Sequence, residues 1–172
     1  MDEREERILE EELAGEVQRL FESLVQELGE TFSRQLLRAE VGYRRVRPQR
    51  TIEDVALPVG TTGCCVAFKD LDVIFVRKGL EPRRSLVTEL HECAHLLLNH
   101  VPVCALTYEE FLHCHDLQYA VYRNRVTTYK TAQETSAEML GRLITQRVMD
   151  HEDEKRKRAT PLVILDLWED NA

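Results

Sequence analysis

The stretch His91-Glu92-Cys93-Ala94-His95 decides how the rest of the chain is interpreted. On a helix, four residues advance the chain by about 400°, so the two histidines lie on one face. Both imidazoles can therefore reach one metal ion, and Glu92, one position after His91, can point at a water on that ion. Two neutral nitrogen ligands beside a carboxylate base suit metal-assisted hydrolysis, and the pattern HExxH is typical of zinc peptidases.

The sequence around this motif predicts a helix from about residue 82 to residue 99. Pro82 is acceptable in a first helical turn, and Pro102 follows the last apolar residues. The buried stripe of this helix is predicted to consist of Leu86, Leu90, Ala94 and Leu97, with Val87, His91, His95 and Leu98 on the adjoining face. The motif therefore falls on a helix that packs against a core.

Three strands are predicted before this helix, at residues 52–57, 64–69 and 72–77. A tight turn at Lys69-Asp70 joins the second strand to the third. The later strands are rich in Val, Ile, Phe and Cys, so at least one face of the sheet should be covered. Cys64 and Cys65 are neighbours on a strand and face opposite sides, which makes them core residues rather than a joint metal site.

Helices are expected on both sides of this region. Residues 3–29 carry an amphipathic pattern that we interpret as a helix packed on the core rather than a dimerising coiled coil. Residues 31–41 suggest a short second helix, and the arginine-rich segment 44–50 reads as a solvated connector or, alternatively, a docking patch for an acidic partner. The apolar stripe of the first helix is Leu13, Val17, Leu20, Phe21, Leu24 and Leu28.

The C-terminal half is less regular. Residues 108–115 look helical, 117–122 could continue that helix or form a strand, and 132–148 form a clear helix. The charged run 151–158 is expected to be a solvated helix end or linker. The tail 159–172 contains the apolar segment 161–168, which should pack back on the domain or dock on a partner.

Length and composition limit the possible classes of protein. A chain of 172 residues suits one domain, residues 1–172, with an N-terminal helix at 3–29, a metal-site core at 52–148 and a tail at 159–172. The net charge of −8 argues against direct nucleic-acid binding. No signal peptide and no spanning apolar run is visible. The 5 cysteines form no CxxC pair, which favours reduced thiols and a cytoplasmic location.

A catalytic zinc usually has a third protein ligand, and Glu134 at the start of a later helix is the strongest candidate. Glu138 lies one turn on and could orient an imidazole from the outer shell, or take the place of Glu134. Both could instead be ordinary exposed charges. His100, about 180° around the helix from His91, is not expected to join the metal. Candidates for stabilising an oxyanion are His113, His115, Tyr119, Tyr122 and Tyr129.

The segment 87–100 (VTELHECAHLLLNH), followed by residues 134–144 (ETSAEMLGRLI), resembles the ImmA/IrrE family of metallopeptidases. That family pairs a HExxH helix ending in Leu-x-x-His with a later helix whose glutamate, three residues before an alanine, is the third ligand. The resemblance implies His91, His95 and Glu134 as metal ligands and Glu92 as the catalytic base. Ala94 stands where the family often has glycine, and residues 140–147 depart from its usual Phe-Ala and Leu-Leu-Met-Pro.

The sequence therefore predicts an α+β, zincin-like fold. A small, about three-stranded sheet should pack on the HExxH helix and a second ligand-bearing helix, with an N-terminal amphipathic helix. The resemblance implies a zinc-dependent endopeptidase (Mn²⁺ being a possible alternative metal) that cleaves a helix-turn-helix repressor encoded nearby in a bacterial or phage genome. The alternative is a metal-binding module without catalysis that regulates a partner, or a toxin-like partner of an adjacent regulator. The oligomeric state is left open.

Overall fold

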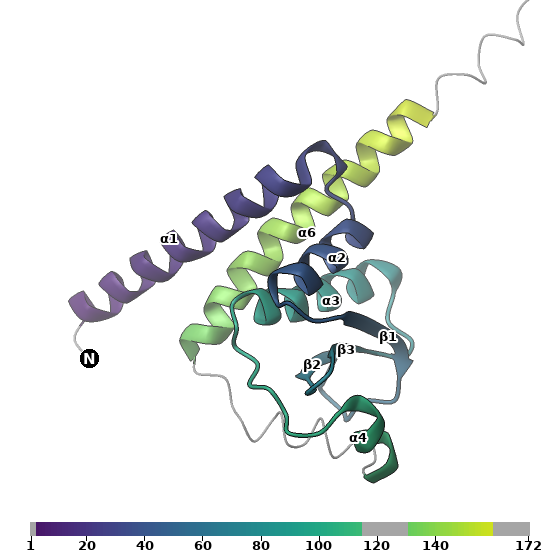
Figure 1. Ribbon diagram of the computed structural model, residues 1–172. Helices are drawn as coiled ribbons and strands as arrows, with labels where there is room; N and C mark the ends of the chain where they lie inside the picture. The colour runs from purple at the N-terminus through teal and green to yellow at the C-terminus, as the bar shows by residue number, and fades with distance from the viewer. Residues whose placement is uncertain (1–2, 115–130, 160–172) are drawn as a thin grey trace, which may run out of the picture.

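In the computed structural model, which describes residues 3–114 and 131–159, several helices pack around a small sheet, giving an α+β fold (Figure 1). Helices α1 (Glu3–Leu28), η1 (Gly29–Thr31) and α2 (Arg34–Arg44) come first. Strands β1 (Gln49–Val55), β2 (Gly63–Ala67) and β3 (Asp72–Arg77) follow. Helices α3 (Pro82–Leu97), α4 (Tyr108–Cys114) and α6 (Thr131–Ala159) complete the described chain.

The sheet has the strand order β1-β3-β2. β2 and β3 form an antiparallel hairpin, whose turn is closed by the Phe68 N–H donating to the Leu71 carbonyl at 2.8 Å. β1 pairs with β3 in parallel, which places β3 in the centre and leaves β1 and β2 at the two edges. The predicted hairpin turn and three-stranded sheet are confirmed, with the first strand beginning three residues earlier than expected.

Each face of the sheet has its own hydrophobic core. The main core lies between the sheet and the helices α1, α2, α3 and α6, and Cys65 belongs to it. The second core lies on the opposite face, where Phe111 of α4 packs near Cys64. The two neighbouring cysteines therefore face opposite sides and are both buried, as the alternation of a strand predicts.

Helices α1 and α6 lie side by side across one end of the main core (Figure 1). Val17 and Leu24 of α1 are fully buried there, which confirms that the amphipathic first helix packs on the core. α6 continues to Ala159. The charged run 151–158 is therefore a helix end, exposed along most of its length. None of the described helices combines the length and the apolar character that crossing a membrane requires.

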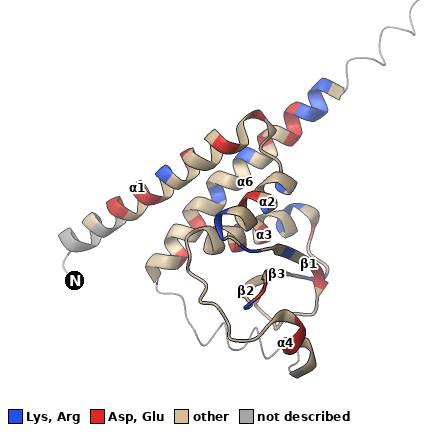
Figure 2. Cartoon of the chain, viewed as in Figure 1, with Lys and Arg blue, Asp and Glu red and all other residues tan. Residues whose placement is uncertain are grey.

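The prediction that the arginine-rich segment 44–50 is a solvated connector was wrong for two of its residues, whereas Val46 and Arg50 are exposed. Basic residues gather where α2 ends and β1 begins (Figure 2), but Arg45 and Arg47 turn inward onto the fully buried carboxylate of Asp72. Arg47 also donates to the Lys69 carbonyl at 2.9 Å. The buried acid was not recognisable from the sequence because Asp72 opens a strand 25 or more residues later.

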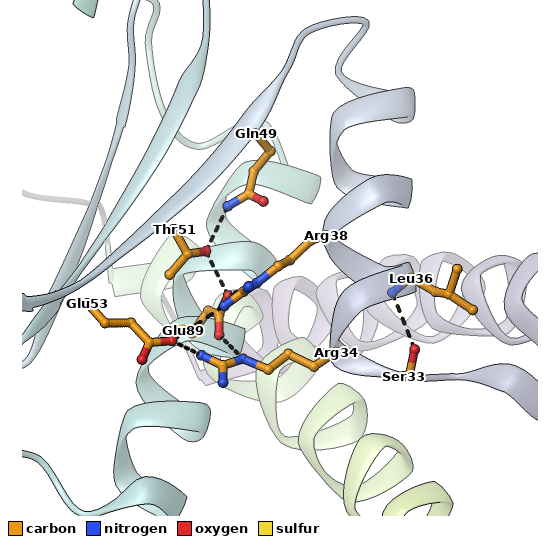
Figure 3. Close-up of polar contacts among 8 residues, drawn as sticks. All are labelled: Ser33, Arg34, Leu36, Arg38, Gln49, Thr51, Glu53 and Glu89. Carbon is orange, nitrogen blue, oxygen red and sulfur yellow. Dashed lines mark hydrogen bonds and ion pairs between the residues drawn. The ribbon is translucent and has the colours of Figure 1, made fainter.

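A second buried carboxylate fixes α3 to α2 and β1 (Figure 3). The Glu89 side chain has no solvent exposure and accepts hydrogen bonds from Arg34 and Arg38 of α2. The Thr51 hydroxyl of β1 donates to it at 2.7 Å. Burial opposes ionisation of this carboxyl group, but these hydrogen bonds and the arginine charges outweigh it and lower the pKa of Glu89. Because Glu89 lies two residues before His91, this network orients the motif-bearing helix.

Most predicted helices are confirmed within a few residues. The second helix begins about three residues later than expected because Ser33 caps it, accepting a hydrogen bond from the Leu36 N–H at 3.3 Å. It also ends about three residues later, at Arg44. The predicted helix at 108–115 is observed over Tyr108–Cys114. The segment 117–122 and the tail segment 161–168 lie outside the described residues.

Candidate metal centre

The site forms where α6 crosses α3, and a glycine permits that crossing. A Cβ atom at Gly141 would lie 3.2 Å from the His91 Cα atom, which is tighter than ordinary packing. Glu134 and Glu138 lie seven and three residues before Gly141, so all three share one face of α6. The close approach at Gly141 therefore turns both carboxylates toward the histidines of α3.

Within the described ranges, one group of His, Cys, Asp and Glu side chains is arranged so that it could hold a metal ion: His91, His95 and Glu134. The Nε2 atoms of the two histidines are 3.1 Å apart. One oxygen of Glu134 lies 3.6 Å from His91 Nε2, and the other lies 3.7 Å from His95 Nε2. The three candidate ligands predicted from the sequence are thus brought together.

These distances fit a shared ion. An ion that binds nitrogen at about 2.1 Å in tetrahedral geometry has neighbouring ligand atoms about 3.4 Å apart. The three separations in this group lie on either side of that value. Two imidazoles and one carboxylate also form a donor set common in catalytic sites, where solvent or substrate takes the remaining position. The residues present therefore fit a divalent metal ion.

The protonation state of His95 suits a metal ligand. Its side chain is 1% exposed. Burial, followed by the neighbouring His91 and His100, lowers the pKa of His95 to about 3. At neutral pH this imidazole is uncharged, which is the form that binds a metal.

Glu92 lies on the side of α3 that faces β2. A Cβ atom at Gly63 of β2 would lie 3.3 Å from both the Cγ and the Oε1 atoms of Glu92, so the strand passes directly over this side chain. The Cys65 side chain and backbone both form hydrogen bonds with the carboxylate. Burial raises the pKa of Glu92, and the electrostatic effect of His91 partly opposes that rise. Glu92 is therefore a buried carboxyl group close to His91 and Glu134 of the candidate metal group.

Glu138 takes a different position from Glu134. One of its oxygens lies 3.5 Å from His91 Nδ1, the imidazole nitrogen that points away from Glu134. Its other oxygen accepts a hydrogen bond from Arg142 Nε at 2.8 Å. Of the two carboxylates considered from the sequence, Glu134 faces both Nε2 atoms, and Glu138 contacts the outer nitrogen of one ligand. Their roles in binding a metal stay predictions.

His100 differs most from the sequence-based expectation. Extrapolating the helix to residue 100 put its side chain on the far face, but α3 ends at Leu97 and the chain folds back. His100 Nδ1 then lies 3.1 Å from His95 Nδ1. The candidate oxyanion donor His113 is 77% exposed on α4, across the sheet from α3. The other candidates, His115, Tyr119, Tyr122 and Tyr129, lie outside the described residues.

Two further contributors to the site were not recognised from the sequence. Gly141 could have been noticed, because a glycine inside a helix often marks a close approach of backbones. The hydrogen bonding of Cys65 to Glu92 could not, since it depends on how β2 is placed over α3. Compared with known proteins, the chain matches no protein family, no curated protein and no solved structure.

Proposed function

We propose that the chain is a zinc-dependent peptidase, with His91, His95 and Glu134 as the metal ligands and Glu92 as general base. The observation that carries this proposal is the buried Glu92 carboxylate beside a three-ligand group. A purely structural metal site has no use for such a base, because its coordination is closed by protein ligands. Zinc is favoured by the nitrogen-rich donor set, and Mn²⁺ is the alternative.

The side chains suggest how the reaction would be divided. A zinc ion, when bound, supplies Lewis-acid polarisation of the scissile carbonyl and an acidified water. Glu92 would then accept a proton from the attacking water and later deliver it to the leaving amine. Its raised pKa, caused mainly by burial, suits a group that must hold a proton between these two steps. His95, uncharged at neutral pH, would bind the metal through Nε2, the nitrogen that lies 3.1 Å from His91 Nε2.

The substrate side of the proposal has two supports. β2 is an edge strand whose last residue, Ala67, already accepts a hydrogen bond from the Cys104 N–H at 2.7 Å. The strand passes over Glu92 at its other end, at Gly63, so an extended peptide beside that end would lie next to the base. The resemblance to ImmA/IrrE metallopeptidases supports a zincin-like identity. It also supports a helix-turn-helix repressor as the cleaved protein, in the cytoplasm of a bacterium or a phage-infected cell.

The proposal is tested with the full chain and a repressor encoded beside its gene. Zinc content and repressor cleavage are measured for the wild type, Glu92→Gln and Glu134→Ala. We expect the wild type to bind zinc and cleave, Glu92→Gln to bind zinc without cleaving, and Glu134→Ala to lose zinc. Equal cleavage by the wild type and the zinc-loaded Glu92→Gln protein would contradict the role of the base. A zinc-bound wild type that cleaves nothing would favour the module that acts by binding a partner.

A further inference from the structure

The turn that ends α3 sends the chain back onto its own last residues. Asn99 adopts a φ of 55°, the left-handed conformation in which helices commonly end. Its N–H donates to the Leu96 carbonyl at 3.1 Å, and the next N–H, of His100, donates to the His95 carbonyl at 3.0 Å. These two hydrogen bonds form a Schellman motif, which brings His100, the third residue after α3, back toward His95, the third-last residue of the helix.

In this motif the contact is frequently hydrophobic, but here it joins two imidazoles. His95 and His100 have ring centroids 5.3 Å apart at an angle of 67°. Their Nδ1 atoms are 3.1 Å apart, within hydrogen-bonding distance. The backbone geometry of the turn therefore produces a specific side-chain pair at a candidate metal ligand.

Arg45 holds this turn in place from another part of the fold. Its Nη1 atom donates to Asn99 Oδ1 at 2.8 Å and to the Leu96 carbonyl at 3.1 Å. The same guanidinium group pairs with Asp72 at the start of β3, where the Arg45 side chain is 7% exposed and that of Asp72 is fully buried. The position of His100 is thus fixed by the sheet as well as by the helix end.

The hydrogen-bond direction between the two histidines follows from the position of the metal group. His95 Nε2 faces His91 Nε2 and Glu134, so it is the nitrogen available to an ion. A neutral imidazole that ligates through Nε2 carries its proton on Nδ1. His95 Nδ1–H then donates to His100 Nδ1, which must be the acceptor.

We infer that His100 is a positioning residue, whose Nδ1 acceptor fixes the ring orientation and tautomer of the metal ligand His95. The inference rests on the proposed metal centre and adds a residue to it. The Nδ1 atoms of the two candidate imidazole ligands have different partners. Glu138 lies beside Nδ1 of the more exposed His91, and His100 lies beside Nδ1 of His95. The buried His95, by contrast, has an imidazole nitrogen rather than a carboxylate beside its Nδ1 atom. Outer partners of this kind typically change metal affinity by about 10- to 100-fold.

The matched pair His100→Asn and His100→Leu tests this role. Asn and Leu have similar size and branching, but only Asn places an acceptor, Oδ1, near the position of the imidazole Nδ1. The zinc dissociation constants of the full-length wild type and both variants are measured by competition with a chelator. The unfolding of the metal-free proteins is measured in parallel.

We expect His100→Leu to weaken zinc binding by about 10- to 100-fold, and His100→Asn to stay within a few-fold of the wild type. The metal-free variants should unfold at similar temperatures, since a general loss of structure would affect both. Equal zinc affinity of His100→Leu and the wild type would overturn the inference, as would equal losses in both variants. A wild type that binds no zinc would overturn the metal centre itself, and the inference with it.

Discussion

The substitution Gly141→Ala sets two effects of known size against each other. Alanine is favoured over glycine inside a helix by about 1 kcal/mol, so the change alone should stabilise α6. The new methyl group, however, would lie 3.2 Å from the His91 Cα atom and 3.6 Å from its backbone nitrogen. Both are backbone atoms of α3, which cannot rotate away as the end of a flexible side chain can.

Overpacking of this kind costs about 1 to 3 kcal/mol, so we expect a net loss of about 1 kcal/mol in the free energy of unfolding. To relieve the contact, α6 must move away from α3 by a few tenths of an ångström. That movement carries Glu134 away from the two histidines. In the wild type, the Nε2 atoms of His91 and His95 lie 3.6 and 3.7 Å from the Glu134 oxygens. Zinc affinity should therefore fall together with stability.

The chain offers a matched control in Gly15, which lies inside α1. A Cβ atom there would meet only the flexible end of Arg19, at 3.4 Å. Gly15→Ala should raise the free energy of unfolding by up to about 1 kcal/mol and leave zinc binding unchanged. Urea denaturation and zinc titration of both variants make the comparison. If Gly141→Ala is stabilised as much as Gly15→Ala and binds zinc like the wild type, the reasoning about the helix crossing is wrong.

Three further predictions concern the carboxylates and the strand beside the site. Glu89→Gln should lower the free energy of unfolding by about 2 kcal/mol at neutral pH, because it removes a buried charge facing two half-exposed arginines. Because the pKa of Glu89 is lowered in the folded state, the stability difference between the wild type and Glu89→Gln should be fully present above the unfolded-state pKa of about 4.5. It should vanish as the pH falls through the folded-state pKa, and urea titrations at several pH values would show this. In zinc competition assays, Glu134→Ala should lose most of the affinity and Glu138→Ala about 10-fold, and the reverse order would exchange their roles. Gly63→Ala should destabilise the fold by about 1 to 3 kcal/mol, because its Cβ would lie 2.4 Å from Thr88 Cγ2, and an unchanged melting temperature would contradict this.

The parts of the fold that follow from local patterns were predictable from the sequence. The spacing of Leu86, Leu90 and Ala94 predicted the motif-bearing helix, and the turn at Lys69-Asp70 predicted the β2–β3 hairpin. The grouping of the candidate ligands also followed, because helical periodicity and a downstream glutamate were sufficient to suggest it.

The rest depends on contacts between distant segments. β1 pairs in parallel with the central β3, although β2 lies between them in the sequence. No local sequence pattern specifies this pairing. The inward turn of Arg45 depends on a buried acid 27 residues away. Helical periodicity predicts the far face of α3 for His100, but the helix ends at Leu97, and Asn99, a residue type that commonly ends helices, turns the chain back.

The most direct test of the metal centre compares zinc binding by the wild type, His95→Ala and Glu92→Gln. Zinc binding is measured by calorimetric titration of the purified full-length proteins. We expect one zinc ion per chain in the wild type and in Glu92→Gln, because Glu92 does not belong to the group of candidate ligands. His95→Ala removes the fully buried imidazole of the group and should bind no zinc at the concentrations that saturate the wild type. Equal zinc binding by His95→Ala and the wild type would contradict a metal centre at the crossing of α3 and α6.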